Sequence, residues 1–600
     1  MRLKSLRIQA RTATFGAITS GSRTEVRVWA PAARELVVRL LDKPGAGDGY
    51  REFPLKRQAG DVFTALLEAG PGGRYFYRVN GGKPVPDPVS RLLPEGVHGP
   101  TEIVDPNAFR WTDDAWRGLR PEDYVLYELH VGTFSREGTF DGILQRLEYL
   151  RDVGVTVIEL MPVAAFPGTR NWGYDGVAWY AVQASYGGPE GLKTLVNAAH
   201  AAGLAVVLDV VYNHLGNEGN YLPMFGPYLT GRYPTPWGNA INYDGPGSQG
   251  VRRYVIENAL YWIAEYHLDG LRLDAVQTMH DASQPHILAE IGENVQELAR
   301  ELGRTVCVIA ETDENDGRIV RPARRGGYGL DALWSDDFHH AVHAYFTGER
   351  RGYYQDFGRP EQIARALEQG FVYQGEYFQF WERPRGTPAR DMRLPQHVIC
   401  IQNHDQVGNR ALGERLHHLV PRGVRRLMAA LLLLAPETPL LFMGQEYDEA
   451  APFLFFTDFS DPELQRAVGD GRRREFREFN WDEVPDPQDP QTFELSKLNW
   501  DLALHGHNAM LKWHRDVLDL RRRVVLPAER TCRARIVNEM LFLDVAAVRP
   551  VLRVTASLAP GADAPGEPGW EEALASEEDG YAVRIFLAAA SESSPSSAAP

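Results

Sequence analysis

Hydrophobic and polar positions alternate along the first part of the chain. The stretch 24–41, TEVRVWAPAARELVVRLL, follows a period of two, and the stretch 73–83, GRYFYRVNGGK, ends in an Asn-Gly-Gly turn signal. A period of two predicts strands with one buried face, and Asn-Gly pairs favour tight hairpins. We therefore predict a small antiparallel β-sandwich of immunoglobulin-like type over residues 1–110, with a proline-rich linker at 83–94.

From about residue 124 the pattern changes to short apolar runs separated by helix-like stretches. Continuous apolar runs are typical of strands buried on both faces, as in a parallel sheet covered by helices. The helix-like stretches 140–154 and 188–203 both end at glycine, which favours a helix C-terminus. The eight apolar runs lie at 125–131, 155–163, 204–214, 268–276, 305–312, 330–338, 397–405 and 439–446.

Eight strand–helix repeats describe a (β/α)8 TIM barrel with insertions. We predict a multidomain α/β chain whose catalytic barrel occupies residues 111–525. Strand-like texture returns after the barrel, at 534–548 and 581–589, so we expect a small C-terminal β domain over 526–600. Its last ten residues, SESSPSSAAP, are small and polar, and we expect this tail to be disordered.

Composition narrows the possible partners. The chain carries 64 Lys and Arg against 80 Asp and Glu, a net charge of −16, which disfavours phosphate backbones and anionic membranes as partners. The longest apolar run, 427–435, is far shorter than the roughly 20 residues that span a bilayer. The first residues lack the apolar region of a signal peptide, and the three cysteines form no CxxC pair. We expect a cytoplasmic protein that binds neither nucleic acid nor membrane, of undetermined oligomeric state.

Candidate chemistry lies at the ends of the predicted strands. In a barrel of this kind, catalytic groups come from the C-terminal ends of the strands. Four strands end in a carboxylate, namely Asp209, Asp274, Glu311 and Asp405. A single such residue is commonly a cap or an ion pair, but four that converge on one rim are costly unless function requires them. Two carboxyl groups beside a glycosidic bond are the groups that cleave it, so the pattern favours glycoside hydrolysis.

An arginine accompanies one of these carboxylates. Arg272 lies two residues before Asp274, on the same face of the strand, close enough to keep that carboxylate ionised. We therefore favour Asp274 as the attacking group.

Four ordered motifs resemble those of the α-amylase superfamily of retaining glucan-active enzymes. They are DVVYNH (209–214), GLRLDAV (270–276), VIAET (308–312) and IQNHD (401–405). The resemblance implies that Asp274 is the nucleophile, that Glu311 is the general acid/base, and that Asp405 is the carboxylate that stabilises the transition state.

The same resemblance assigns the subsite of the attacked glucose. It implies that the ring is held by four polar residues and a stacking tyrosine. These are Asp209, His214, Arg272, His404 and Tyr174. Many amylases continue after the nucleophile motif with a Lys-His pair that contacts substrate and calcium, but Gln277 and Thr278 stand here. We therefore expect no metal and no other cofactor.

Longer stretches indicate a narrower group. Residues 213–244, 334–357 and 442–461 resemble the maltooligosyltrehalose trehalohydrolases of this superfamily. That resemblance implies hydrolysis, by double displacement, of the α-1,4 bond beside a terminal trehalose, with maltooligosyl trehalose and related α-glucans as partners. The N-terminal sandwich equally resembles those of glycogen branching enzymes and α-1,6 debranching enzymes, and the four motifs do not separate hydrolysis from transfer. Both alternatives stay open, as does glucan binding by the sandwich.

The sequence gives weaker evidence for the residues that bind the sugars on either side of the attacked glucose. Sugars stack on aromatic rings, although most single aromatic residues belong to a core. The segment 226–238 is rich in glycine and proline, so we expect a rim loop that presents Tyr233 and Trp237 to substrate. Asp336, Asp337 and His339 follow the sixth strand and are candidates to hold the trehalose end, with a helix N-cap as the alternative for either aspartate.

A catalytically silent barrel that only binds or scaffolds is the alternative from another class. It predicts the loss of at least one of Asp274, Glu311 and Asp405. All three residues are present, which disfavours this hypothesis.

Overall fold

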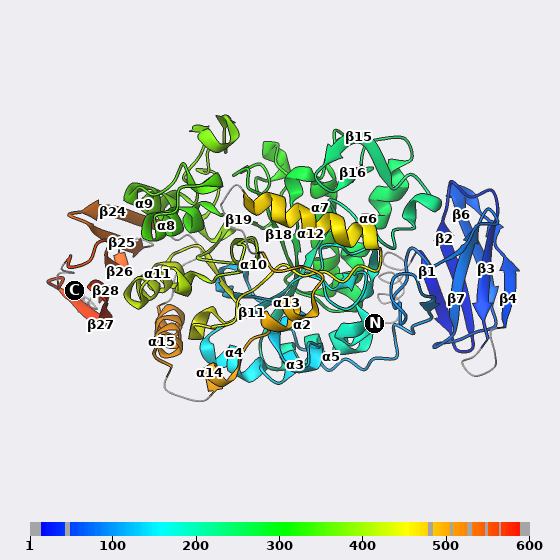
Figure 1. Cartoon of the computed structure of the whole chain (residues 1–600), viewed down its shortest axis with the longest axis horizontal. Coiled ribbons are helices and arrows are strands. Elements are labelled where there is room, and N and C mark those ends of the chain that lie inside the picture. The colour runs from blue at the N-terminus through cyan, green and yellow to red at the C-terminus, as the bar shows by residue number, and fades with distance from the viewer. Residues whose placement is uncertain are drawn as a thin grey trace, which may run out of the picture.

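The computed structural model describes residues 14–42, 49–477, 484–504, 508–524, 531–546, 550–562 and 566–588. The expected disordered tail, 591–600, lies outside the described residues. Figure 1 shows three parts in a row, with the N-terminal sheets (blue) at one end, the barrel in the middle and the C-terminal sheet (orange to red) at the other. In the part of the chain that is described, no helix is both long and apolar enough to cross a membrane.

Two antiparallel sheets form the N-terminal part, as predicted. Alternation of buried and exposed positions along these strands places residues such as Val26, Val28 and Tyr77 between the sheets. One sheet has the order β1 (Gly16–Ser20), β2 (Arg23–Trp29), β6 (Val62–Leu67), β5 (Lys56–Arg57). The other has the order β4 (Tyr50–Pro54), β3 (Leu36–Leu41), β7 (Arg74–Val79), β8 (Pro84–Val85), and β9 (Thr101–Glu102) pairs with β7.

The proline-rich segment that follows is a packed strap and not a free linker. Residues 85–91 are all buried. Arg91 forms an ion pair of 2.9 Å with Glu265 at the end of α6 (Ser248–Glu265), and the Tyr254 hydroxyl of that helix donates to the carbonyl of Pro88 at 2.9 Å. The strap thereby ties the N-terminal sheets to the barrel.

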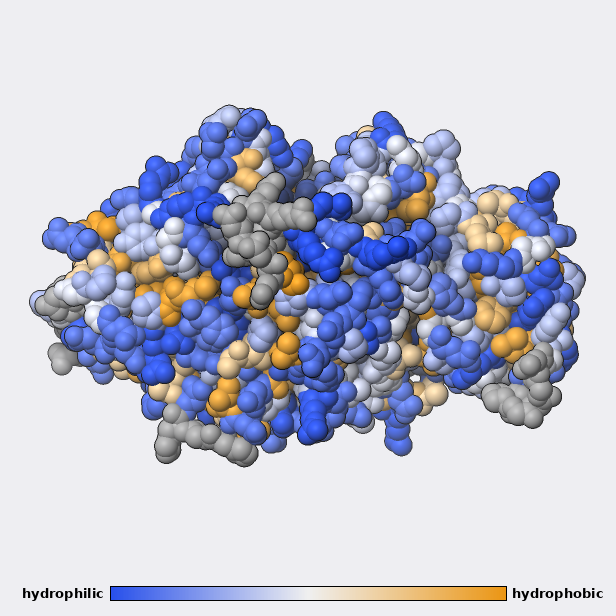
Figure 2. Space-filling model, in the orientation of Figure 1, coloured by the Kyte–Doolittle hydropathy of each residue, from blue (hydrophilic) through white to orange (hydrophobic). Residues whose placement is uncertain are grey.

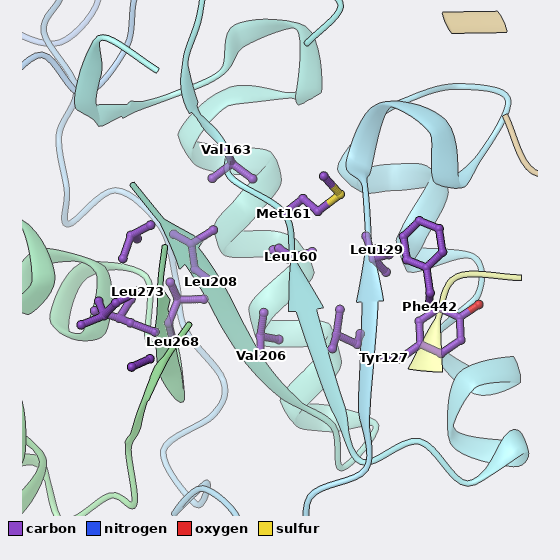
Figure 3. Close-up of a cluster of buried hydrophobic side chains, with 14 of the residues drawn as sticks. Tyr127, Leu129, Leu160, Met161, Val163, Val206, Leu208, Leu268, Leu273 and Phe442 are labelled. Atoms are coloured by element: carbon purple, nitrogen blue, oxygen red, sulfur yellow. The ribbon is translucent and has the colours of Figure 1, made fainter. Parts of the chain in front are cut away.

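The barrel has the eight parallel strands that the apolar runs predict, in chain order. The ring closes where β10 pairs with β23. The strands are β10 (Leu126–Leu129), β11 (Val157–Leu160), β14 (Ala205–Val210), β17 (Gly270–Leu273), β18 (Cys307–Ala310), β19 (Ala332–Trp334), β22 (His397–Cys400) and β23 (Thr438–Phe442). Figure 3 shows Leu129, Leu160, Val206 and Leu208 projecting from β10, β11 and β14 into the core between strands and helices.

The helices around the barrel follow the predicted pattern with one difference. The expected helix at 188–203 is α5 (Gly188–Ala201), and the chain turns after it at Gly203, whose φ of 82° suits glycine. The expected helix at 140–154 is two, α3 (Phe140–Leu144) and α4 (Leu147–Val153). The break lies at Arg146, whose φ of −118° and ψ of 2° are not helical.

Further helices cover the rest of the barrel and lead to the C-terminal sheet. They include α7 (Ile287–Leu302), α8 (Asp337–Thr347), α9 (Pro360–Gln369), α11 (Arg422–Leu434), α12 (Pro462–Arg477) and α15 (Ala509–Arg523). The sheet has the order β24 (Thr531–Val537), β25 (Met540–Ala546), β26 (Pro550–Ser557), β28 (Tyr581–Ala588), β27 (Trp570–Glu578), and it packs on α9 and α11. The predicted C-terminal β structure is thus present.

Candidate active site

Positions that face the inside of the barrel change from apolar to charged along several of its strands. Near the start of the strands, residues such as Leu126, Val157 and Val207 pack against one another. Because side chains alternate across a strand, the next inward position is two residues further on. That position holds a charged side chain on several neighbouring strands, namely Glu128, Glu159, Asp209, Arg272 and Glu311. The barrel interior is therefore filled by apolar side chains near the start of the strands and lined by charged side chains toward their C-terminal ends.

Arg272 lies at the centre of these charges and is fully buried. Its Nη1 donates to Asp209 Oδ2 at 2.8 Å and to Asp274 Oδ1 at 2.6 Å, and its Nη2 lies 3.4 Å from Glu311 Oε2. The guanidinium also lies over the ring of Trp334, 4.4 Å from the centroid. One cation thus binds carboxylates that come from three strands, which offsets their mutual repulsion.

Asp274 is held by two donors and is still accessible to solvent. Asn213 Nδ2 donates to its Oδ2 at 2.9 Å, while Arg272 binds the other oxygen. The side chain remains 12% exposed. A fixed and accessible carboxylate of this kind suits a nucleophile.

Glu311 has the environment of an acid. Burial raises the pKa of Glu311 well above its ordinary value of 4.5; Arg272 opposes the shift, and the negative charges of Asp274 and Asp405 add to it. The backbone N–H of Ala275 donates to Glu311 Oε2 at 2.6 Å and fixes the carboxyl group. A raised pKa favours the protonated form of a carboxyl group, and that form is able to protonate a leaving oxygen.

Asp405 completes the set from the start of α10 (His404–Gly408). Its side chain is 43% exposed, far more than that of Asp274 or Glu311, and lies 3.4 Å from His404 Nε2. The short helix is capped by Asn403, whose side chain accepts from the N–H groups of Asp405 and Gln406. Asp405 is thus the most exposed of the three carboxyl groups.

Three further predicted residues form one hydrogen-bonded group. The Tyr174 hydroxyl donates to Asp209 Oδ2 at 2.6 Å and lies 2.9 Å from His404 Nε2. The rings of Tyr174 and His404 stack, with centroids 5.2 Å apart. Burial raises the pKa of Asp209 to about 7; Arg272 opposes that shift and Asp274 adds to it. The structure therefore brings together the residues expected around the attacked sugar.

The predicted rim loop at 226–238 includes β15 (Leu229–Thr235), which forms a hairpin with β16 (Gly238–Ile241). At its tip Trp237, 42% exposed, stacks on His214 with centroids 4.4 Å apart. Tyr233 donates to Asp244 Oδ2 at 2.6 Å and packs against His280. Figure 2 shows the surface notched between the lobe of this hairpin and the lobe above α8 and α9.

The three candidates after the sixth strand have different surroundings. Asp336 lies beside Asp405; burial and then that neighbouring charge raise the pKa of Asp336 to about 7. Asp337 is fully buried, 2.8 Å from Arg385 Nη1, and also accepts from Asn315 Nδ2. Asp336 stands at the N-cap of α8 without a side-chain cap bond, and Asp337 is the first residue of the helix.

His339 lies one turn further along α8 and is also buried. Its two ring nitrogens bond to the carbonyl of Ile401 at 2.8 Å and to the hydroxyl of Tyr354 at 2.7 Å. The structure therefore brings Asp336 to the carboxylates and turns Asp337 and His339 toward the protein interior.

Two carboxyl groups at the site were missed from the sequence. Glu128 and Glu159 lie in register on β10 and β11, each 1% exposed. Both stand inside apolar runs, YELHV and VIELM, where a lone glutamate was the available signal. Because a charged side chain is rarely buried without a partner, that signal could have placed both residues in the half of the barrel interior that is lined by charges.

A polar cavity of about 180 Å³ adjoins the catalytic rim, between the loops that follow β17 and β18. Its walls include Gln277, His280, Thr312, Glu314 and Tyr328. Within the described residues, the Gln277 Oε1 atom is buried and has no hydrogen-bond partner. Also within them, no cluster of three or more His, Cys, Asp or Glu side chains is arranged to hold a metal ion.

Comparisons with protein families match two parts of the chain. Residues 104–224 match the catalytic domain of alpha amylase. Residues 14–108 match carbohydrate-binding module 48, the isoamylase N-terminal domain. The second match covers the N-terminal sheets and the strap.

Individual relatives match over most of their length. A malto-oligosyltrehalose trehalohydrolase of Saccharolobus solfataricus is 46% identical over 86% of this chain and 88% of its own. One from Rhizobium sp. (strain M-11) is 49% identical over 82% of this chain and 84% of its own. A crystal structure of a Salmonella typhimurium protein, provisionally named an alpha amylase, is 39% identical, with a TM-score of 0.87 and coverage of 96% of this chain and 99% of its own.

Proposed function

Because this chain belongs to the malto-oligosyltrehalose trehalohydrolase family, within the α-amylase superfamily, we propose that it hydrolyses the α-1,4 glucosidic bond next to the terminal trehalose of maltooligosyl trehalose. The products are trehalose and a maltooligosaccharide. The observation that carries the chemistry is the buried Arg272, which binds Asp274 and Asp209 and lies 3.4 Å from Glu311.

The first half of the reaction uses two carboxyl groups. Glu311 gives its proton to the glycosidic oxygen as the bond to the anomeric carbon breaks, and Asp274 attacks that carbon from the other face. Trehalose leaves with the proton, and the maltooligosyl unit remains as an ester of Asp274. Arg272 and Asn213 hold the attacking carboxylate in place.

The second half reverses these roles. Glu311, now a carboxylate, takes a proton from water, and the resulting hydroxide displaces Asp274 from the anomeric carbon. Two inversions at one carbon retain its configuration. Glu311 ends protonated and Asp274 ends ionised, ready for another turnover.

The remaining polar residues bind the ring that is attacked. We assign Asp405, His404 and Asp209 to the sugar hydroxyls, Tyr174 to the ring face, and His214 to the side of the cavity covered by Trp237. Asp405 stabilises the charge that develops on the ring. Among the candidates after β19, we propose only Asp336 as a substrate contact, with Asp337 and His339 supporting α8 from inside.

The leaving trehalose lies on the side of the acid, because its oxygen receives the proton of Glu311. The polar cavity beside Thr312 is on that side, and the buried Gln277 Oε1 atom in its wall lacks a partner within the described residues. A hydroxyl of the substrate is a suitable donor to that oxygen. We therefore propose this cavity as the trehalose end of the site.

Product analysis tests the proposal. Maltotetraosyl trehalose, maltohexaose and amylose are incubated separately with the parent protein and with Glu311→Gln as the matched control. We expect rapid release of free trehalose from the first substrate, slow action on the two plain glucans, and loss of most turnover in the control. New α-1,6 branch points in amylose without free trehalose would instead assign a glycogen branching enzyme, and cleavage of α-1,6 bonds would assign a debranching enzyme.

A further inference from the structure

Glu128 binds His404 with both carboxylate oxygens. It lies on β10, in the charged half of the barrel interior, and is 1% exposed. The backbone N–H of His404 donates to Oε2 at 2.9 Å, and the ring Nδ1 lies 2.5 Å from Oε1. An ionised carboxylate accepts and does not donate, so the Nδ1 position carries a proton.

The other ring nitrogen of His404 also has to donate. Its Nε2 lies 2.9 Å from the Tyr174 hydroxyl, whose single proton goes to Asp209 Oδ2 at 2.6 Å. That same Oδ2 atom already accepts from Arg272 Nη1, so it is an acceptor. The Tyr174 oxygen is therefore left to accept from Nε2–H, and both nitrogens of the His404 ring are protonated.

We propose that Glu128 is a positioning residue that keeps His404 a doubly protonated imidazolium, and that it thereby sets the donor direction from His404 to Tyr174 to Asp209. The inference deepens the proposed hydrolysis and rests on it. Glu128 itself has no role toward substrate in this account; it acts through His404.

Other charges around the ring are consistent with this state. Burial lowers the pKa of His404, but Asp405 and Glu128 outweigh burial and raise it from 6.5 to about 9, against the opposing charge of Arg272. The imidazolium also acts on two groups near the C-terminal ends of the first two barrel strands, β10 and β11. It opposes the burial that raises the pKa of Glu159, and it adds to the burial that lowers the pKa of His130 to about 4.

Loss of the second proton would reverse the hydrogen-bond chain. A lone pair on Nε2 would face Asp405 at 3.4 Å and would take the Tyr174 proton, so that Asp209 would lose that donor. The proposed grip on the sugar hydroxyls then fails at His404 and Asp209 together. Hydrolysis should therefore require the imidazolium.

Glu159 supplies a matched control for Glu128. The two side chains are in register on adjacent strands and are buried to the same extent. Burial, and then the charge of Glu128, raise the pKa of Glu159 well above 4.5 and so favour its neutral form. Glutamine at Glu159 resembles that neutral form, whereas glutamine at Glu128 removes a carboxylate from the His404 ring.

The experiment compares the pH dependence of kcat/KM for trehalose release in the parent, Glu128→Gln and Glu159→Gln. We expect the ratio of kcat/KM in Glu128→Gln to kcat/KM in the parent to fall at least about tenfold from about pH 5.5 to about pH 8.5. The reason is that a decrease of one unit in the pKa of His404 is a tenfold change in the ratio of its two protonation states. Glu159→Gln should keep the parent profile. Equal profiles for Glu128→Gln and the parent would overturn the inference, whereas a parent that releases no trehalose would overturn the proposed function.

A second measurement does not depend on turnover. Ring carbon-13 NMR of the parent, labelled at histidine, should contain one signal that titrates near pH 9, and His404→Gln should remove that signal. The absence of such a histidine in the parent would overturn the inference even if trehalose is released. A titration near pH 9 that Glu128→Gln leaves in place would overturn the role of Glu128.

Discussion

Strand β17 carries a buried acid network at each of its ends, and the two networks are built differently. Asp269 precedes the strand and accepts four hydrogen bonds, two on each oxygen. The donors are Trp116 Nε1 and Arg304 Nη2 on Oδ1, at 2.7 and 2.8 Å, and His200 Nε2 and Val206 N on Oδ2, at 2.8 and 2.9 Å. On the other side of His200, Nδ1 lies 2.8 Å from Asp113.

The network at the other end of the strand is incompletely satisfied. Within the described residues, Asp209 Oδ1 and Arg272 Nε are buried without a hydrogen-bond partner. Each buried polar atom of this kind costs about 1–3 kcal/mol. The comparison teaches that the network around Asp269, here called the lower network, stabilises the barrel. The network around Arg272, here called the upper network, keeps polar groups free of internal partners, as binding a polar substrate requires.

The largest expected effect breaks the upper network. Asp274→Asn removes the proposed nucleophile and should lower kcat for trehalose release by at least about 10⁴-fold. The free energy of unfolding should change by less than about 1 kcal/mol, because Arg272 keeps its ion pair with Asp209 and the asparagine amide oxygen can still accept a hydrogen bond. Steady-state kinetics and urea denaturation measure the two quantities. Retained turnover would contradict the assignment of Asp274.

The next effect breaks the lower network. Asp269→Asn leaves donors from His200 and Arg304 without their charged acceptor and should lower the free energy of unfolding by about 3–5 kcal/mol. The kcat of the folded fraction should stay the same. Asp114→Asn, at an exposed position of the neighbouring segment, is the control and should change neither quantity. A large loss of kcat in Asp269→Asn would show that the two ends are not independent.

The pH dependence of the free energy of unfolding distinguishes the lower network from the upper one. Burial opposes ionisation of Asp113 and Asp269, but bonds to histidine prevail and hold the pKa of each below its ordinary 3.8. Their stabilisation is therefore complete above about pH 4 and is lost as pH falls through the lowered values. Burial likewise lowers the pKa of His200, but its two aspartates raise it above 6.5, so its share is present below about pH 6.5 and lost above the raised value.

Activity should depend on pH over a different range from stability. The acid Glu311 must be protonated, so kcat/KM should fall as pH rises through its raised pKa. Urea denaturation and kinetics over the same pH series provide the test. If Asp113→Asn loses as much stability in acid as the parent does, the loss in acid does not come from the network around Asp269.

The smallest expected effect concerns the rim. Trp237→Ala removes an exposed ring stacked on His214 and should raise KM about tenfold, equivalent to about 1.4 kcal/mol, with little change in kcat. The free energy of unfolding should change by less than about 0.5 kcal/mol. Tyr50→Ala, at another exposed aromatic residue on β4 of the N-terminal sheets, is the control. Equal KM values for the two variants would exclude Trp237 from the site.

The barrel could be predicted because each of its strands is an apolar run, and on several of them the inward positions end in a polar group. Asp209, Asp274 and Glu311 follow that rule, and the structure joins them through Arg272. The same rule hides Glu128 and Glu159, because each has hydrophobic residues on both sides along the chain.

Positions beyond the strands were harder to predict, because a helix that begins there turns successive side chains in different directions. Asp336 thus meets Asp405, while Asp337 meets Arg385 inside the protein. The hairpin of β15 and β16 was expected as a loop, since proline and glycine within it masked two short strands.

The strap at 85–91 gives the N-terminal sheets a fixed place on the barrel. Its backbone is buried, and a Cβ at Gly250 of α6 would come within 2.1 Å of the Trp29 ring, so the two parts meet without slack. A protease needs an extended, accessible segment, which the strap does not offer. Cleavage of the folded protein within the strap should therefore be slow, and a barrel engineered without the sheets would present the surface beneath Trp29 to water.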